Sequence, residues 1–254
     1  MKKNLILYPH GLGDCVLLTP ALREYKKQTG NHISVVTLER FKSAKFFDNN
    51  PDVDKIYYCK DAWHDFDNSN IGFQSLQKQW KQFAVENGYN FMCMPMHSIN
   101  ESKILLNSKY LNIDLKNPLT EIHTNHEDVI QAENIIKDIV GDNDFGFIQT
   151  NTGVPSKDLP INFGRKWLDK NKNIKHFIEI GVEIDYLEYN INVQFEIMRR
   201  AKAVCIPDSV FYHACHAIDK DVDFVYFGRG RDIWERVKPL HSVNENVVYD
   251  LESI

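Results

Sequence analysis

Residues 4–22 read NLILYPHGLGDCVLLTPAL, and this stretch decides the fold of the chain. Its apolar start predicts a buried strand, the glycines Gly11 and Gly13 predict a tight turn, and the residues from Asp14 onward predict a helix. A strand, a glycine turn and a helix in this order open nucleotide-binding α/β domains. Glycine lets a ligand approach the backbone, and the free amides of a helix start attract anionic groups. The sequence therefore predicts a ligand site at this turn.

The carboxylate at this turn, Asp14, has two interpretations. It can cap the start of the helix, as aspartate commonly does. It can also act as a general base at the mouth of a substrate cleft, since open parallel sheets bind their ligands at the carboxyl ends of the strands. The residues alone leave both interpretations open.

Strands and helices are expected to alternate along the chain. Strands are expected over 3–9, 32–38, 54–59, 91–95, 145–150 and 176–180, and helices over 14–28, 40–48, 74–87, 98–110, 126–140, 162–170 and 192–201. This alternation is typical of parallel sheets covered by helices. The amphipathic helix at 126–140 stops at Gly141, and we expect a boundary there between two lobes, residues 1–140 and residues 141–254.

The composition is that of an ordinary globular protein. Hydrophobic residues make up 43% of the 254 residues, charged residues make up 26%, and the formal net charge is -5. An acidic balance without a basic tail argues against a dedicated nucleic-acid binder, which usually presents a broad basic surface. The five cysteines are scattered and lack the spacing of a zinc site, which indicates reduced core residues.

Neither a membrane span nor a signal peptide is visible in the sequence. No apolar run approaches the ~20 residues that cross a bilayer, and the short run after Lys2 and Lys3 ends at a proline. We therefore expect a cytoplasmic protein without a transmembrane segment. Peripheral contact with the inner membrane surface stays open.

Two longer segments carry a family pattern. Residues 11–23 read GLGDCVLLTPALR and are followed by ISVVT at 33–37 and NPDVDKI at 50–56. Residues 203–217 read AVCIPDSVFYHACHA and are followed by VDFVYFG at 222–228. In order and spacing, the two segments resemble glycosyltransferase family nine, the ADP-heptose lipopolysaccharide heptosyltransferases. The chain departs from the family pattern at Val210, where the family has glycine, and a valine limits how closely a diphosphate approaches the backbone.

This resemblance implies a fold and an activity. The fold is α/β, with two Rossmann-like lobes facing a cleft in the GT-B architecture. The N-terminal lobe would lie on the acceptor side, and the C-terminal lobe would bind the nucleotide sugar. The activity is inverting, metal-independent transfer of a sugar from a nucleotide-diphosphate donor to a hydroxyl group of a saccharide or glycolipid. No cofactor is expected besides the nucleotide sugar itself, which is a co-substrate.

The resemblance and the local patterns together nominate the site residues. Asp14 is the expected catalytic base. The expected donor-binding residues are Gly13, Thr152, Arg165, Lys166, Asp208, Ser209 and His213. The expected acceptor-binding residues are His10, Arg229 and Arg231. We expect no metal site, because the Asp-x-Asp triplets at 52–54 and 221–223 arise readily by chance in a chain rich in aspartate.

Each nominated residue also has a structural interpretation. Asp208 and Ser209 stand where a strand gives way to a helix, so either can be an N-cap. His213 alone would more often be a core residue. The basic candidates can belong to a solvated helix start at 165–166 or to a flexible surface loop at 228–232.

Three other functions compete with sugar transfer to a saccharide or glycolipid. A catalytically weak nucleotide-sugar-binding module is favoured by Val210 and opposed by the presence of Asp14. A viral-type enzyme that glycosylates modified DNA bases is consistent with a compact chain, but the net charge favours a saccharide acceptor over nucleic acid. An epimerase or another dinucleotide enzyme is disfavoured, because Gly11 and Gly13 are followed by Val16 where the Gly-x-Gly-x-x-Gly turn has its third glycine.

Overall fold

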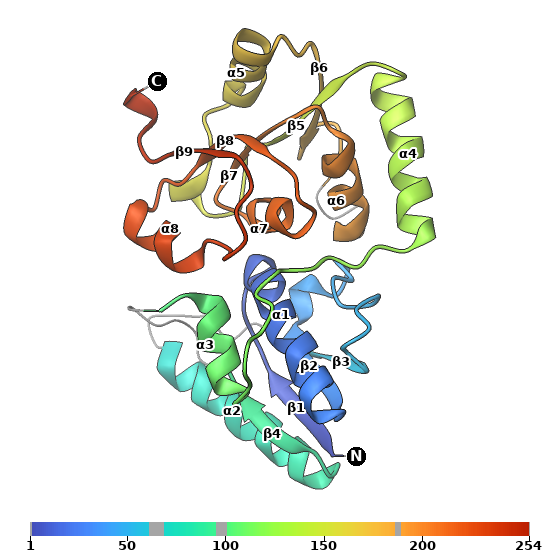
Figure 1. Ribbon diagram of the computed structural model, residues 1–254, viewed down its shortest axis with the longest axis vertical. Helices are drawn as coiled ribbons and strands as arrows, with labels where there is room; N and C mark the ends of the chain where they lie inside the picture. Colours follow the sequence, from blue (N-terminus) through green and yellow to red (C-terminus); the bar gives the residue numbers. More distant parts are fainter. Residues whose placement is uncertain (1, 61–68, 95–100, 186–188, 254) are drawn as a thin grey trace.

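The structure is a computed structural model that describes residues 2–60, 69–94, 101–185 and 189–253. It contains a four-stranded and a five-stranded sheet, and every strand pairing that it describes is parallel. Figure 1 shows the two sheets one above the other along the long axis of the molecule, with helices packed around each. The expected α/β fold with parallel sheets is therefore confirmed.

The first sheet is formed by the N-terminal part of the chain. Its strands, in spatial order, are β3 (Lys55–Cys59), β2 (His32–Leu38), β1 (Lys3–Leu7) and β4 (Asn90–Cys93). Its helices are α1 (Leu12–Thr29), α2 (Ser69–Glu86) and α3 (Lys103–Tyr110). Alternate residues of β1 face opposite sides, so Ile6 packs in the cluster with α1, whereas Leu5 and Leu7 pack in the cluster with α2. Helix α3 packs against α1.

The second sheet is formed by the C-terminal part. Its strands, in spatial order, are β6 (His176–Ile180), β5 (Phe145–Gln149), β7 (Ala203–Pro207), β8 (Val222–Tyr226) and β9 (Glu245–Val248). Its helices are α5 (Phe163–Lys172), α6 (Ile191–Arg200), α7 (Val210–Ala217) and α8 (Arg231–Val237). On β5, Ile148 packs in the cluster with α5, and Phe147 packs in the cluster with α6 and α7.

Helix α4 (His126–Val140) has the bounds that the sequence predicts. The Asn125 side chain accepts a hydrogen bond from the amide of Asp128, and the Asp128 carboxylate accepts one from the amide of Asn125, which forms a capping box. The helix ends at Gly141, whose φ of 65° suits glycine. Although α4 precedes the expected lobe boundary, it packs against α6 and β6 of the second sheet. The boundary between residues 140 and 141 stays a prediction.

The helix expected over 40–48 is wrong. Only the short 3-10 helix η1 (Glu39–Phe41) forms, and turns follow it. Lys45 has a left-handed φ of 51°, which a continuous helix does not tolerate. Phe46 and Phe47 are adjacent in sequence and both buried, with ring centroids 4.8 Å apart, so this segment is a loop folded onto the core rather than one face of a helix.

The two halves share one hydrophobic cluster. It joins Leu12 and Phe46 of the first half to Phe195 and Phe211 of the second, and the rings of Phe46 and Phe195 lie 6.5 Å apart. The N-terminal end of α1 packs against α7 where the halves meet (Figure 1). In the part of the chain that the structure describes, no helix combines the length and the apolar composition that a membrane span requires.

Candidate functional site

The candidate site lies where the first turns of α1 and α7 meet. Each helix follows a central strand of its sheet, β1 in the first and β7 in the second. In the first sheet, β1 pairs with β2 on one side and with β4 on the other. In the second sheet, β5 pairs with β6 on one side and with β7 on the other. The order of the strands therefore reverses beside β1 and beside β5. Open α/β sheets bind ligands outside the carboxyl ends of strands at such points. The contact between α1 and α7 therefore brings together the two sheet edges at which open α/β sheets commonly bind ligands.

Gly13 lies where α1 packs closely against α7. A Cβ atom on this residue would lie 2.6 Å from Cδ2 and 3.1 Å from Nε2 of His213, and 3.7 Å from the Cα atom of Val210. Only a residue without a side chain fits there unless His213 moves. Asp14 follows directly and lies close enough to His213 to influence its ionisation. The glycine therefore brings an expected acceptor-side residue next to an expected donor-side residue.

His213 is neutral at physiological pH. Burial lowers its pKa to about 4, and the negative charges of Asp208 and Asp14 oppose this effect without overcoming it. Its side chain is 5% exposed, and its Nδ1 atom has no hydrogen-bond partner among the residues that the structure describes. A neutral imidazole with an unsatisfied ring nitrogen is able to donate or accept one further hydrogen bond.

Asp208 is the centre of the donor-side group. Its carboxylate is almost fully buried, and its Oδ2 atom lies 3.2 Å from Nζ of Lys157 and 2.7 Å from Nε and 2.5 Å from Nη2 of Arg229. The Lys157 ammonium also donates a hydrogen bond of 3.3 Å to the carbonyl oxygen of Asp208. Two cations surround one carboxylate, so positive charge is in excess just before α7. The partial positive charge of the α7 N-terminus adds to it.

Ser209 is the N-cap of α7. Its hydroxyl group accepts a hydrogen bond of 3.3 Å from the amide of Phe211. Ser209 is therefore the N-cap, as its structural interpretation predicts. The Asp208 carboxylate instead contacts Lys157 and Arg229. Contact between Ser209 and a donor stays a prediction.

Lys157 contacts Asp208, and sequence reasoning did not nominate it as a site residue. It ends the 3-10 helix η2 (Pro155–Lys157), in the loop after β5. Thr152 shapes this loop, because its amide and its hydroxyl group donate hydrogen bonds of 2.7 and 2.8 Å to Oδ1 of Asp158. Thr152 thus holds the loop that carries Lys157, and its contact with a donor stays a prediction. A lysine in the loop after a central strand was the available signal.

Arg165 has different partners from those that we expected. Its Nε atom donates to Glu179 at 2.7 Å, and its Nη2 atom donates to Glu183 at 2.6 Å. Glu179 in turn accepts a hydrogen bond of 2.5 Å from the hydroxyl group of Thr150. These contacts hold the guanidinium beside β6, and none of them involves Asp208. The neighbouring Lys166 is exposed.

Arg229 and Arg231, which are both expected to bind the acceptor, lie in different surroundings. Arg229 joins the donor-side residue Asp208, as described above. The Arg231 side chain is 74% exposed at the start of α8, with Nε 3.8 Å from a carboxylate oxygen of Glu235. His10 is buried, and its ring lies 4.2 Å from that of Tyr8, at the end of β1. The acceptor roles of His10, Arg229 and Arg231 stay predictions.

Asp14 lies in the first turn of α1 and is half-buried. Its carbonyl oxygen accepts a hydrogen bond of 3.0 Å from the hydroxyl group of Tyr8. The structure gives α1 no side-chain cap at Gly11, so Asp14 is an acidic first-turn residue and not the N-cap. Within the described residues, no group of three or more His, Cys, Asp or Glu side chains is arranged to hold a metal ion.

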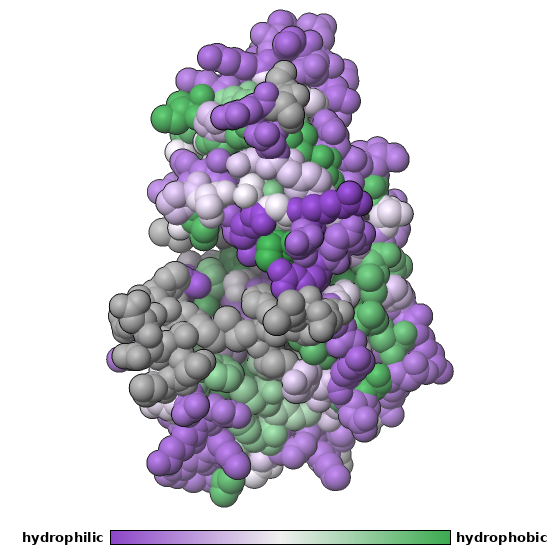
Figure 2. Space-filling view, turned by 90° about the vertical axis from the view of Figure 1, so that its left-hand side faces the viewer, coloured by the Kyte–Doolittle hydropathy of each residue, from purple (hydrophilic) through white to green (hydrophobic). Residues whose placement is uncertain are grey.

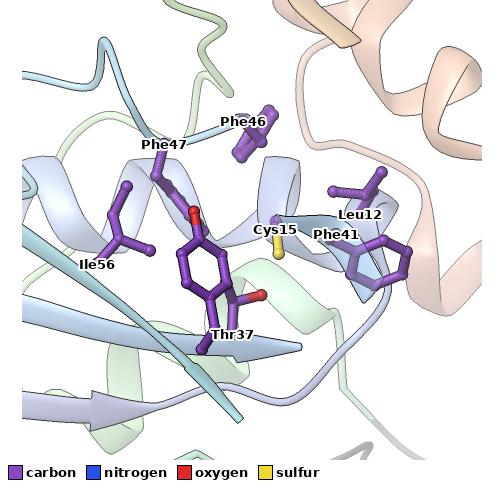
Figure 3. A pocket seen from close by; sticks show the side chains of 8 residues that line it. Leu12, Cys15, Thr37, Phe41, Phe46, Phe47 and Ile56 are labelled. Atoms are coloured by element: carbon purple, nitrogen blue, oxygen red, sulfur yellow. The ribbon is translucent and has the colours of Figure 1, made fainter. Parts of the chain in front are cut away.

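Two views show the surroundings of the site. Figure 2 shows strongly hydrophilic residues gathered at mid-height on one face, at the level where the two halves meet. Figure 3 shows a small pocket beside the first turn of α1, with Cys15 and Leu12 opposite Phe46 and Phe47. Its volume of about 10 Å³ is room for about one water molecule, so it does not hold a sugar ring.

No protein-family model matches this sequence, and no curated protein sequence matches it either. Solved structures do match. The glycosyltransferase family 9 protein from Veillonella parvula DSM 2008 is 14% identical, with a TM-score of 0.69 over 99% of this chain and 87% of that chain. ADP-heptose LPS heptosyltransferase II from E. coli is 11% identical, with a TM-score of 0.65 over 97% of this chain and 90% of that chain.

A further similar structure is the E. coli heptosyltransferase WaaC with ADP-2-deoxy-2-fluoro heptose. It is 12% identical, with a TM-score of 0.59 over 97% of this chain and 92% of that chain. At these identities the likeness shows the fold. The α/β fold with two parallel sheets that the resemblance to glycosyltransferase family nine implies is therefore confirmed across nearly the whole chain.

Proposed function

We propose that this chain is an inverting, metal-independent glycosyltransferase that moves a sugar from a nucleotide-diphosphate donor to a hydroxyl group of a saccharide or glycolipid. One observation carries the proposal. The half-buried carboxylate of Asp14 and the buried carboxylate of Asp208, which Lys157 and Arg229 contact, both lie near His213, where the N-termini of α1 and α7 meet. A base opposite an anion site is what displacement of a diphosphate by an alcohol requires.

The donor diphosphate would bind before α7. Lys157 and Arg229 are positioned to exchange part of their contact with Asp208 for phosphate oxygens, and the unpartnered Nδ1 of His213 supplies a further hydrogen bond. The helix dipole adds positive potential at the same place. These groups stabilise the negative charge that grows on the leaving diphosphate.

The acceptor would bind on the side of α1. Asp14 takes the proton of the acceptor hydroxyl group, and the oxygen of the acceptor attacks the anomeric carbon of the donor sugar. The bond from that carbon to the diphosphate oxygen breaks in the same step, and the bonding electrons leave with the nucleoside diphosphate. Attack from the side opposite the leaving group inverts the anomeric centre. A positioned base contributes a factor of about 10² to 10⁴ in rate.

The test is donor turnover with a panel of nucleotide sugars. One similar structure carries an ADP-sugar analogue, so ADP-heptose is the first donor and GDP- and UDP-sugars follow. We expect calorimetric binding of one nucleoside diphosphate and its release from the matching sugar, accelerated by a saccharide acceptor. Absence of both binding and release for every donor would refute the proposal.

One observation favours a second function, a nucleotide-sugar-binding module with weak catalysis. Val210 is the first residue of α7 and is buried, so its side chain occupies space at the helix start where a diphosphate would approach the backbone. Binding of a nucleotide sugar without transfer to any acceptor would support this second function. Transfer at an ordinary turnover rate would exclude it.

A further inference from the structure

A buried lysine, Lys103, lies beside the first turn of α1. Only 2% of this residue is exposed, although lysine is almost never fully buried without a partner. It is the first residue of α3, and its Nζ atom lies 5.6 Å from the centre of the Tyr8 ring. Burying an ammonium group is costly unless charged or polar groups compensate for it. Its position therefore requires an explanation that packing alone does not give.

Hydrogen bonds fix α3 against the residues that surround Asp14. Asn107 follows Lys103 by one helical turn, and its Nδ2 atom donates to the Tyr8 hydroxyl at 3.4 Å and to the carbonyl oxygen of Leu17 at 3.2 Å. The Tyr8 hydroxyl in turn donates to the carbonyl oxygen of Asp14 at 3.0 Å. Lys103 is thus held at a set place relative to the first turn of α1.

Lys103 and Asp14 influence each other's charge. Burial lowers the pKa of Lys103, whereas the negative charge of Asp14 is the larger of two effects that raise it, the other being Cys15. Because this interaction is mutual, the ammonium group favours the ionised form of Asp14 to the same extent.

Within the part of the chain that the structure describes, three other titratable groups near Asp14 are neutral at physiological pH. They are Tyr8 at the end of β1, Cys15 on α1 and His213 on α7. Burial raises the pKa of Tyr8 and of Cys15, and it lowers the pKa of His213 to about 4. Of the groups named here, Lys103 is the one that carries a charge toward Asp14.

We infer that Lys103 is a positioning residue of the reaction, which holds the Asp14 carboxylate in its ionised form so that it can take the proton of the acceptor hydroxyl. This inference rests on the proposed function. It gives the acceptor side a cation of its own, separate from the Lys157 and Arg229 pair on the donor side. No bond to Lys103 forms or breaks in the reaction.

The test compares Lys103→Met with Lys103→Arg. Methionine fills a similar space without charge, so Asp14 should protonate at higher pH. The acidic limb of the pH profile of kcat/KM should then move up by about 1 pH unit, while Lys103→Arg keeps the wild-type limb. Lys109→Met is the matched control, because the Lys109 side chain is on the same helix and is 69% exposed. If Lys103→Met fails to fold, Lys103→Gln replaces it.

A second measurement separates this inference from the proposed function. The Asp14 carboxyl carbon is titrated by NMR in labelled protein, with Asp14→Asn to assign its signal. We expect the midpoint to be about 1 pH unit higher in Lys103→Met than in the wild type. Equal midpoints overturn the inference even if the enzyme transfers sugar. A shifted midpoint in a protein that transfers no sugar supports the interaction and refutes the proposed function instead.

Discussion

The two aspartates of the site stand in different surroundings, although each lies near the N-terminus of a helix that follows a central strand. Asp208 is 1% exposed and contacts two cations, Lys157 and Arg229. Asp14 is half-buried in the first turn of α1, and the cation near it, Lys103, belongs to a different helix. A carboxylate held by two cations is suited to positioning them, whereas a carboxylate that is partly exposed is suited to exchanging a proton. The same residue type is therefore suited to two different roles.

The largest effect is expected from substituting the two aspartates separately. Asp14→Asn should lower the transfer rate by about 10² to 10⁴ and leave the affinity for the nucleoside diphosphate unchanged, because the amide keeps the shape but does not accept the proton. Asp208→Asn should change the affinity, because it releases the two cations. Steady-state kinetics and calorimetry on both variants measure this difference. Near wild-type transfer by Asp14→Asn would remove the proposed distinction.

The next largest effect is a change of the free energy of unfolding with pH. It comes from His213, which lies at the contact between α1 and α7. The pKa of His213 is lowered from 6.5 to about 4 by burial, so the unfolded chain binds a proton at a higher pH than the folded chain does. The contribution of neutral His213 to the free energy of unfolding is complete above pH 6.5. It is lost as the pH falls toward 4, by about 3 kcal/mol in total. Urea unfolding at several pH values should show this loss, and His213→Gln should remove it. An unchanged slope in that variant would mean that other groups cause it.

Local sequence patterns predicted most of the elements that carry this comparison. The bounds of α4 and the strand before α1 follow from periodicity and from the glycine signals around them. The loop around Lys45 was predicted wrongly, because its conformation depends on contacts of Phe46 with Phe195, 149 positions away in the sequence. The secondary-structure propensities of individual residues do not include a contact between such distant positions.

The sequence nominated single residues of the candidate site but not their arrangement. Sequence reasoning selected Gly13, Asp208 and His213 but did not show that the first and the last of these touch. It missed Lys157, whose role depends on a loop that brings it to Asp208, 51 positions away. It selected Arg165, whose guanidinium group forms ion pairs with Glu179 and Glu183. Charged pairs distant in sequence are set by the tertiary fold, and a single sequence does not record them.

A third prediction uses the two glycines of the first turn. Gly13→Ala should destabilise the protein by about 1 to 3 kcal/mol and lower transfer, because the new methyl group would lie 2.6 Å from His213. Gly11→Ala is the matched control, since its Cβ atom would lie 3.6 Å from an Asp14 carboxylate oxygen, an ordinary contact, and its φ of -63° suits any residue. Denaturant unfolding measures both variants. Equal stability of the two would show that the α1 and α7 contact is loose in solution.

The smallest expected effect sharpens the donor side of the comparison. Lys157→Met and Arg229→Met should each weaken binding of the nucleoside diphosphate by about 1 kcal/mol or more, roughly a fivefold to tenfold loss of affinity, because each removes a charge-assisted contact to phosphate. Arg231→Met is the control, since that side chain is 74% exposed and stands away from Asp208. Calorimetric titration with the nucleoside diphosphate measures all three. Because each substitution also frees Asp208 from one cation, the pair Lys157→Met and Asp208→Asn should be combined. If the loss seen in Lys157→Met is recovered in the double variant, the cost came from leaving the Asp208 carboxylate with Arg229 alone, and Lys157 does not bind the donor.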